Sequence, residues 1–247
     1  MNHKMGWIPD FPDHRDFMFS AIRKVPAVLP PMIDLRSKCS PVEDQGDIGS
    51  CTAQALVGAL EFLEIKDNVR FKDLSRLFLY YCERVIEKTV GYDSGAQIRD
   101  GIKSLKKQGI CSEKSWPYDI SKFTVKPPSS CYKEALVNKI KSYHRILTVD
   151  EMRACLAEGY PFAFGFSVYE SFDSQEVAQT GVVNMPQKSE QQLGGHAVLC
   201  VGYDDSHKRF IVRNSWGQNW GMKGHFTMPY DYLADRNLSD DLWTIRD

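Results

Sequence analysis

The sequence predicts an α+β fold, in which a mainly helical half precedes a half built from short antiparallel strands. Between residues 51 and 108, apolar residues recur at helical spacing, and turn residues separate the segments. From about residue 141 onwards, short runs rich in Val, Ile and aromatic residues alternate with Gly, Asp and Ser clusters, as antiparallel strands do. Two halves of such different character predict a cleft between them.

The length of 247 residues and the 43% hydrophobic content fit one large domain or two lobes that share a core. We expect an N-terminal strap over residues 1–31 and a main domain over residues 32–247. Within that domain, the helical lobe is expected at about 45–135 and the strand-rich lobe at about 140–230, with termini that cross between the lobes.

The expected elements can be placed individually. Helices are predicted from residue 51, over 74–88 and 96–108, and near 132–138. The helix over 74–88 should have one apolar face, formed by Leu74, Leu77, Phe78, Tyr81 and Val85. Thr148 and Glu151 form a capping box that opens a helix ending at Gly159. Strands are predicted over 141–147, 162–168, 196–202, 209–213 and 225–228. Near the C-terminus, Tyr232, Leu233, Leu242 and Trp243 are expected to dock on the body.

The N-terminal strap contains prolines at 9, 12, 26, 30 and 31, which exclude a long helix. We therefore expect an extended segment that docks on the body through Trp7, Phe11 and Phe17.

Composition excludes several classes of function. The net charge of −1 gives no reason to expect a nucleic-acid partner. No apolar run reaches the roughly 18 residues that a membrane span needs, and no hydrophobic leader is visible, so a cytoplasmic location is favoured while a trimmed secreted form stays open. Seven cysteines without a Cys-x-x-Cys pair argue against a zinc ribbon and a dense disulfide framework. We expect no metal and no cofactor.

Cys51 stands at the start of a predicted helix, where the helix dipole and free N–H groups favour a thiolate. Taken alone, it could also be a small residue packed at a helix start. A cysteine nucleophile needs a base, a group that orients the base, and donors for the oxyanion. His196 opens one predicted strand and Asn214 follows the next, so a hairpin would set them side by side. The side-chain amide of Gln45 could then point at the same place as the Cys51 N–H.

These segments resemble the papain-like cysteine proteases. The resemblance rests on Gln45-Gly46, Gly49-Ser50-Cys51, His196-Ala197-Val198 and Asn214-Ser215-Trp216-Gly217 with Trp220-Gly221. Their kind, order and rough spacing are the known signature of that family. Weaker matches extend the likeness from about residue 30 to residue 230. The resemblance implies a two-lobe fold, with a helical left lobe, an antiparallel sheet or barrel as the right lobe, and the active-site cleft between them.

The family's residue roles carry over position by position. Cys51 would be the nucleophile, His196 the base and then the acid, and Asn214 the residue that orients the imidazole. Gln45 and the backbone of Cys51 would form the oxyanion hole, and Trp216 would shield the His196–Asn214 hydrogen bond. The matching substrate-binding positions are Ser94, Gly95, Gly165 and Gly195.

The resemblance implies hydrolysis of peptide bonds in a peptide or protein, through a thioester at Cys51, by a monomer. Endopeptidase action is favoured because no insertion plugs the cleft. A transpeptidase or amidase with the same machinery is the alternative, and an inactive binding homologue is disfavoured because the triad is complete. Residues 6–31 do not match a helical propeptide, and we expect them to cover part of the cleft and inhibit the enzyme.

The chain also departs from the family's pattern. Ile48 replaces a cysteine that normally lies before the nucleophile, and its partner near Tyr92 and Asp93 is missing too, so one structural disulfide is absent. Thr52 replaces an aromatic residue. The resemblance leaves two other bridges open, Cys82 with Cys131 or Cys111 with Cys131.

Overall fold

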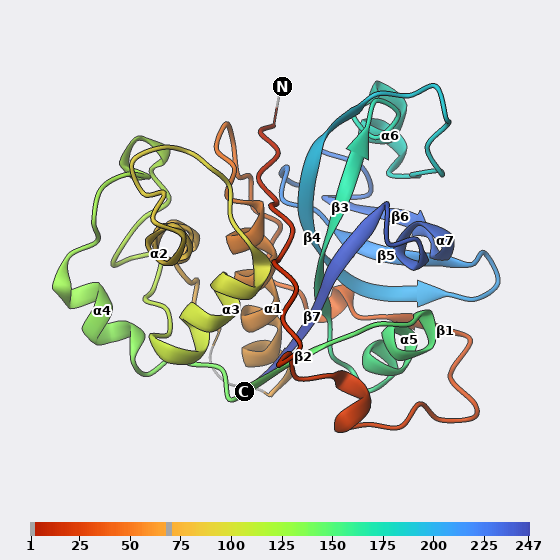
Figure 1. Ribbon diagram of the computed structural model, residues 1–247, viewed down its shortest axis with the longest axis horizontal. Coiled ribbons are helices and arrows are strands. Elements are labelled where there is room, and N and C mark those ends of the chain that lie inside the picture. The colour runs from red at the N-terminus through yellow and green to blue at the C-terminus, as the bar shows by residue number, and fades with distance from the viewer. Residues whose placement is uncertain (1–2, 68–70) are drawn as a thin grey trace.

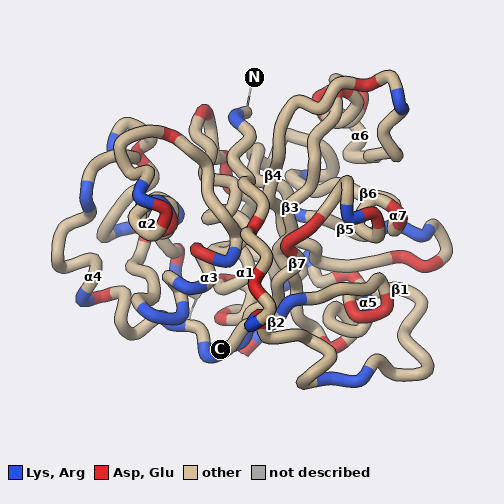
Figure 2. Tube along the Cα trace, in the orientation of Figure 1, with Lys and Arg blue, Asp and Glu red and all other residues tan. Residues whose placement is uncertain are grey.

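The computed structural model describes residues 3–67 and 71–247, so the first two residues of the expected strap and residues 68–70 lie outside the described part. Figure 1 shows helices α1, α2 and α3 on one side of the molecule and a twisted antiparallel sheet on the other. The N-terminal chain runs between the two. This arrangement confirms the α+β fold class. Lys and Arg alternate with Asp and Glu along both lobes (Figure 2).

The helical lobe is organised around one buried helix. α1 is buried from Cys51 to Glu64. Most of its residues are small or apolar on all sides, and α2, α3 and β4 pack around it. The helices of this lobe are α1 (Cys51–Lys66), α2 (Arg76–Glu87), α3 (Ile98–Lys107) and α4 (Ser129–Ala135). Val85 is 50% exposed, so its expected place on the buried face of α2 is wrong. α4 also begins and ends earlier than the expected 132–138.

The strand-rich lobe forms an open sheet, not a closed barrel. Within the described residues its order is β2-β7-β3-β4-β5-β6, and β1 pairs with β4. The strands are β1 (Met32–Asp34), β2 (Ser142–Arg145), β3 (Phe162–Tyr169), β4 (Gln192–Asp204), β5 (Arg209–Arg213), β6 (His225–Pro229) and β7 (Ser239–Arg246). Helices α5 (Val149–Ala157), α6 (Gln175–Thr180) and α7 (Tyr230–Ala234) lie between them in sequence. The capping box of Thr148 and Glu151 is confirmed.

The two ends of the chain differ most from expectation. β7 was not predicted, yet it lies inside the sheet between β2 and β3. Leu242 and Trp243 are buried because they belong to this strand. In the strap, Phe11 and Phe17 are 74% and 62% exposed, so their expected docking is wrong, whereas Trp7 packs against the main core.

Cys82, Cys111 and Cys131 carry free thiols, and neither suggested bridge is present in the described part of the chain. Among the helices of residues 3–67 and 71–247, none combines the length and apolarity that crossing a membrane requires.

Candidate active site

The structure brings the catalytic candidates together at the junction of the two lobes. Cys51 opens α1, His196 lies in β4, and Asn214 directly follows β5. Because β4 and β5 pair antiparallel, the imidazole Nε2 of His196 lies 2.8 Å from the amide Oδ1 of Asn214. All three residues are buried. The Trp216 indole stacks on the His196 ring with centroids 5.0 Å apart, which covers this hydrogen bond from one side.

Gln45 is held in place by the opposite lobe. Its backbone N–H donates to the carbonyl of Ser215 at 2.9 Å, and its Oε1 accepts from the Ser215 hydroxyl at 2.7 Å. These two contacts fix the side-chain amide, so its Nε2 donates to the carbonyls of Ile48 and Lys4, each at 3.0 Å. The Lys4 carbonyl therefore occupies the donor that would receive a substrate oxyanion.

Residues 3–8, which we call the plug, cross the cleft. The Trp7 N–H donates to the Gly195 carbonyl at 2.9 Å, and the Ala96 N–H donates to the Gly6 carbonyl at 2.8 Å. The Ile8 N–H donates back to the Ala96 carbonyl at 3.0 Å. The plug thus binds both lobes through its backbone, as an added strand does.

Gly6 lies in close contact with the backbone of both Gly49 and Gly95. A Cβ atom added there would come within 2.0 Å of the Gly49 carbonyl oxygen, and one added at Gly95 would come within 2.2 Å of the Gly6 carbonyl oxygen. Only a residue without a side chain fits between these two backbone segments. The plug position next to the nucleophile therefore requires glycine.

Burial shifts the pKa values of Cys51 and His196 in opposite directions. Burial raises the pKa of the Cys51 thiol to about 12, although the N–H groups of Ala197 and Gly6 oppose this rise. Burial lowers the pKa of His196 to about 4, although the hydrogen bond that its ring donates to Asn214 Oδ1 opposes this fall. Both groups are neutral in this closed form. The expected lowered pKa of Cys51 is wrong here, because the plug removes the water that would stabilise a thiolate.

Hydrogen bonds tie the nucleophile loop to the helical lobe where the family's disulfide is missing. The Asp93 carboxylate accepts from the Gly49 N–H at 3.1 Å and from the Tyr80 hydroxyl. Lys4 of the plug also pairs with Asp93 at 2.7 Å. Sequence reasoning noted the missing cysteine at this place but not the role of the carboxylate.

Thr52 has a polar neighbour in place of the family's aromatic packing. Its hydroxyl donates to Glu83 Oε2 at 2.9 Å. Glu83 is completely buried, and this burial raises the pKa of its carboxyl well above the usual value. The pair fills the helix interface behind Cys51.

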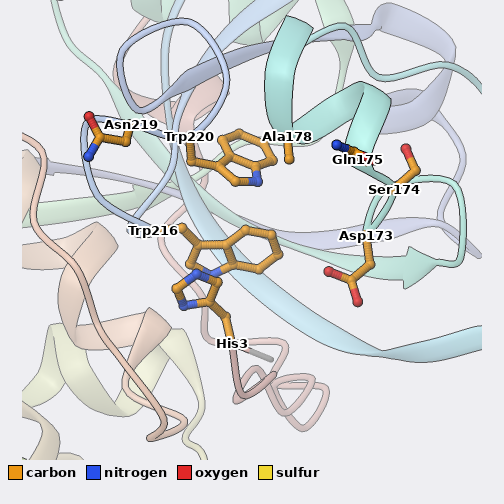
Figure 3. A pocket seen from close by; sticks show the side chains of 8 residues that line it. All are labelled: His3, Asp173, Ser174, Gln175, Ala178, Trp216, Asn219 and Trp220. Carbon is orange, nitrogen blue, oxygen red and sulfur yellow. The ribbon is translucent and has the colours of Figure 1, made fainter. Parts of the chain in front are cut away.

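A pocket of about 420 Å³ adjoins Trp216 on one side of the nucleophile. Figure 3 shows the His3 ring lying flat against Trp216, with Trp220 and the Asp173 carboxylate facing the same space. The two stacked rings have centroids 4.7 Å apart and an interplanar angle of 11°. The first described residue of the plug therefore fills part of this pocket.

The plug contacts three of the four predicted substrate-binding residues. Trp7 lies against Gly165 and Gly195, and Gly6 lies against Gly95. The Ser94 hydroxyl instead donates within its own lobe, to Thr89 Oγ1 at 2.8 Å. Sequence reasoning missed Ala96, whose backbone makes the two hydrogen bonds to the plug, because a backbone partner leaves no side-chain signal.

The comparisons with known proteins agree with this geometry. The family described as papain family cysteine protease matches residues 29–239. An uncharacterised peptidase C1-like protein of Acanthamoeba polyphaga mimivirus is 44% identical, over 100% of this chain and 88% of its own length. Procathepsin L of Felis catus is 31% identical, over 82% of this chain and 61% of its own.

Among solved structures, xylellain, a cysteine protease from Xylella fastidiosa, superposes with a TM-score of 0.89 at 46% identity. The match covers 98% of this chain and 95% of xylellain. Bromelain from Ananas comosus, solved in complex with the E64 inhibitor, shares the fold at 23% identity, with a TM-score of 0.69 over 88% of this chain and 99% of bromelain. The chain therefore belongs to the papain family of cysteine proteases.

Proposed function

We propose that the protein is an endopeptidase that cleaves peptide bonds through a thioester at Cys51, and that its N-terminal plug holds it closed. The contact that supports closure most directly is the Lys4 carbonyl on Gln45 Nε2, at 3.0 Å. With this contact in place, no substrate carbonyl can reach the same donor. The expected inhibitory segment began at residue 6, whereas the blocking contacts start at His3.

Once the plug leaves, His196 takes the thiol proton of Cys51 and the sulfur attacks the substrate carbonyl carbon. The negative charge moves to the carbonyl oxygen, which receives hydrogen bonds from Gln45 Nε2 and the Cys51 N–H. His196 then gives its proton to the leaving nitrogen as the C–N bond breaks. Water attacks the resulting thioester with His196 as the base, which releases the acid and restores the thiol. Asn214 holds the imidazole ring throughout.

The direction of the plug explains why it can block without being cut. His196 must protonate the leaving nitrogen, so the C-terminal part of a substrate must lie on the His196 and Trp216 side. We call this the leaving-group side, and the opposite side, at Gly165, the acyl side. The plug has His3 on the leaving-group side and Trp7 on the acyl side, so it runs backwards.

The path of the plug also supports endopeptidase action. A continuous chain occupies both sides of Cys51, with His3 beside Trp216 and Trp7 beside Gly165. A cleft that takes polypeptide on both sides can bind the interior of a substrate. The test is a peptide blocked at both ends, because an exopeptidase cannot cleave it.

The sharpest test of closure is Gly6→Ala in the full chain, since the added Cβ would meet the Gly49 carbonyl. We expect faster alkylation of Cys51 by iodoacetamide and faster cleavage of the blocked peptide, each by at least about tenfold. Gly91→Ala is the matched control, because nothing lies within 4 Å of its added Cβ. Unchanged alkylation in Gly6→Ala would refute closure by the plug.

The same sample tests the reaction. Cys51 that alkylates in Gly6→Ala without any cleavage of blocked peptides would exclude the endopeptidase and favour a binding homologue. Products that carry an added amine in place of the hydroxyl from water would favour a transpeptidase.

A further inference from the structure

We propose that Asp241 determines specificity on the acyl side of the cleft, by selecting a planar substrate side chain that carries an N–H donor, as the Trp indole does. The slot that receives this side chain is formed by Gly165, Gly195 and the Asp241 carboxylate, and we call it the acyl-side slot. The inference rests on the proposed function, because it names the substrates of the same cleft.

The backbone around Asp241 is shaped to present its side chain. β7 pairs with β3 at Trp243 and Ala163, but the register shifts before Asp240 pairs with Gly165. Asp241 lies at this irregularity with a φ of 57°, a left-handed conformation that costs a residue with a side chain about 1–2 kcal/mol. Bulges of this kind redirect side chains beside functional sites. Here the bulge turns a carboxylate toward the cleft.

Both carboxylate oxygens of Asp241 act as acceptors. Oδ1 accepts from the Arg145 guanidinium at 3.1 Å. Oδ2 accepts from the Trp7 indole Nε1 at 3.1 Å and from the Asp10 backbone N–H at 2.8 Å. The carboxylate is 1% exposed, so water does not satisfy it in this form. In Figure 2, acidic stretches of the strap and of β7 lie next to each other at this place.

The rest of the slot fits a flat ring. A Cβ added at Gly165 would come within 1.9 Å of the Trp7 indole Cε2, and one added at Gly195 within 2.8 Å of its Cε3. The indole therefore lies directly on the two glycines, with its N–H directed at Asp241. The slot combines a flat floor with one buried acceptor.

When the plug leaves, Asp241 Oδ2 loses the indole donor. A substrate Trp restores this hydrogen bond, and the planar guanidinium of Arg offers the same kind of donor. Phe or Leu fills the slot but does not replace the indole donor, so the buried Oδ2 keeps only the Asp10 N–H, which is less favourable. A site that is built around a hydrogen bond discriminates against analogues that lack it.

The first experiment measures the contact between Trp7 and Asp241 through the alkylation rate of Cys51, so it does not depend on catalysis. In the full chain, Trp7→Phe removes the indole N–H and keeps a flat ring. We expect Cys51 to alkylate about tenfold faster, because the closed form loses the hydrogen bond between the indole and the buried Asp241 side chain. In the Asp241→Asn background, Trp7→Phe should change the rate by less than about twofold, because Asn has one acceptor oxygen and cannot serve both Arg145 and the indole.

Two features of the chain allow this double-mutant cycle of Trp7→Phe and Asp241→Asn to be interpreted. Asn tolerates the left-handed backbone of position 241, so the variant is expected to fold. Asp240→Asn is the matched control, because Asp240 also binds Arg145, at 2.9 Å, without a contact to Trp7. In that background Trp7→Phe should keep its full effect. An equal effect of Trp7→Phe in the Asp241→Asn background and in the unmodified chain would overturn the proposal.

The second experiment uses blocked dipeptide substrates on the Gly6→Ala protein. With Trp, Arg, Phe or Leu as the second residue on the acyl side, we expect kcat/KM for Trp to exceed that for Phe about tenfold. Asp241→Asn should remove this preference, whereas Asp240→Asn should keep it. A preference for Phe, or one that survives Asp241→Asn, would overturn the proposal. If no substrate is cleaved, the proposed function fails, while the alkylation cycle still decides the role of Asp241.

Discussion

The two parts of the N-terminal strap are held to the body in different ways. Residues 10–19, which we call the anchor, bind through buried charges and a core side chain. The Asp10 carboxylate accepts from the Trp243 indole at 2.9 Å and from the Arg99 N–H at 3.1 Å. Asp16 pairs with Arg99 and Arg145, and Phe19 is completely buried. These contacts belong to the fold itself.

The plug is held mainly by its backbone and by two rings, that of Trp7 on the glycines and that of His3 on Trp216. Lys4 is exposed, and its ion pair with Asp93 lies at the surface. The plug can therefore leave while the anchor stays, because little of the core depends on it. Under the proposed function, the strap is a tethered inhibitor, in which the anchor remains in place while the plug opens. It also shows that deletion of all 30 or so residues would damage the fold, so tests should change only the plug.

The largest expected effect is a loss of folding stability when the anchor is changed. Asp10→Ala removes the buried carboxylate that accepts from the Trp243 indole and lies 3.7 Å from Arg99 Nε, and we expect a loss of about 3–5 kcal/mol in the free energy of unfolding. Urea denaturation measures this loss. Asp13→Ala is the control within the anchor, because the Asp13 carboxylate binds Arg15 near the surface. Similar curves for both variants would show that the anchor is not part of the core.

A change in the plug should greatly increase the alkylation rate of Cys51 but lower the free energy of unfolding only a little. Trp7→Ala removes the ring from the acyl-side slot. We expect Cys51 to alkylate about 100-fold faster, because the closed form loses the free energy gained by burying a large side chain. Phe11→Ala is the matched control, because this strap aromatic is 74% exposed and should leave the rate unchanged. If Trp7→Ala instead destabilised the protein as much as Asp10→Ala, the distinction between plug and anchor would fail.

The plug should open more easily as the pH rises. Burial and the neighbouring Asp10 raise the pKa of Asp241 to about 7 in the closed form, with Asp240 adding to the rise and Arg145 opposing it. In the open form water reaches Asp241 and its pKa falls, although Asp10 stays in place, so the closed form binds a proton more tightly. Closure is therefore strongest at low pH, weakens as the pH rises to about 7, and then levels off.

Alkylation of Cys51 measures this dependence, provided that the rate is divided by that of Gly6→Ala at the same pH. The division cancels the titration of the thiol itself. We expect the ratio to rise about tenfold between pH 5 and pH 7. A ratio that stays flat or falls would show that Asp241 does not couple the plug to protons.

The smallest effect should come from the surface ion pair of the plug. Lys4 and Asp93 lie 2.7 Å apart, but the lysine side chain is 48% exposed, so solvent screens the attraction. Lys4→Ala should speed the alkylation of Cys51 about twofold in dilute buffer, and the difference should vanish at about 0.5 M salt. A larger effect that persists in salt would mean that the pair acts as part of the buried network.

The sequence by itself determined the chemistry of this protein. Cys51, His196, Asn214 and Gln45 lie in local motifs with a characteristic order. Such motifs can be recognised in the sequence because each specifies its own turn or strand. The α+β class followed from the change in periodicity between the two halves. An extended N-terminal strap was expected from its prolines and aromatics, although Trp7 alone of the three proposed aromatics packs on the core.

Only the tertiary structure decided which contacts hold the plug between the lobes and which groups surround Asp241. The Trp7–Asp241 contact joins residues 234 positions apart, and it depends on a bulge in β7, a strand whose place inside the sheet had no local signal. Gly6 fits its position because two backbone segments from elsewhere in the chain leave no room for a Cβ. Asp93 replaces a disulfide by hydrogen bonds that no spacing rule encodes. Such features arise from the packing of distant segments, so residue order alone cannot reveal them.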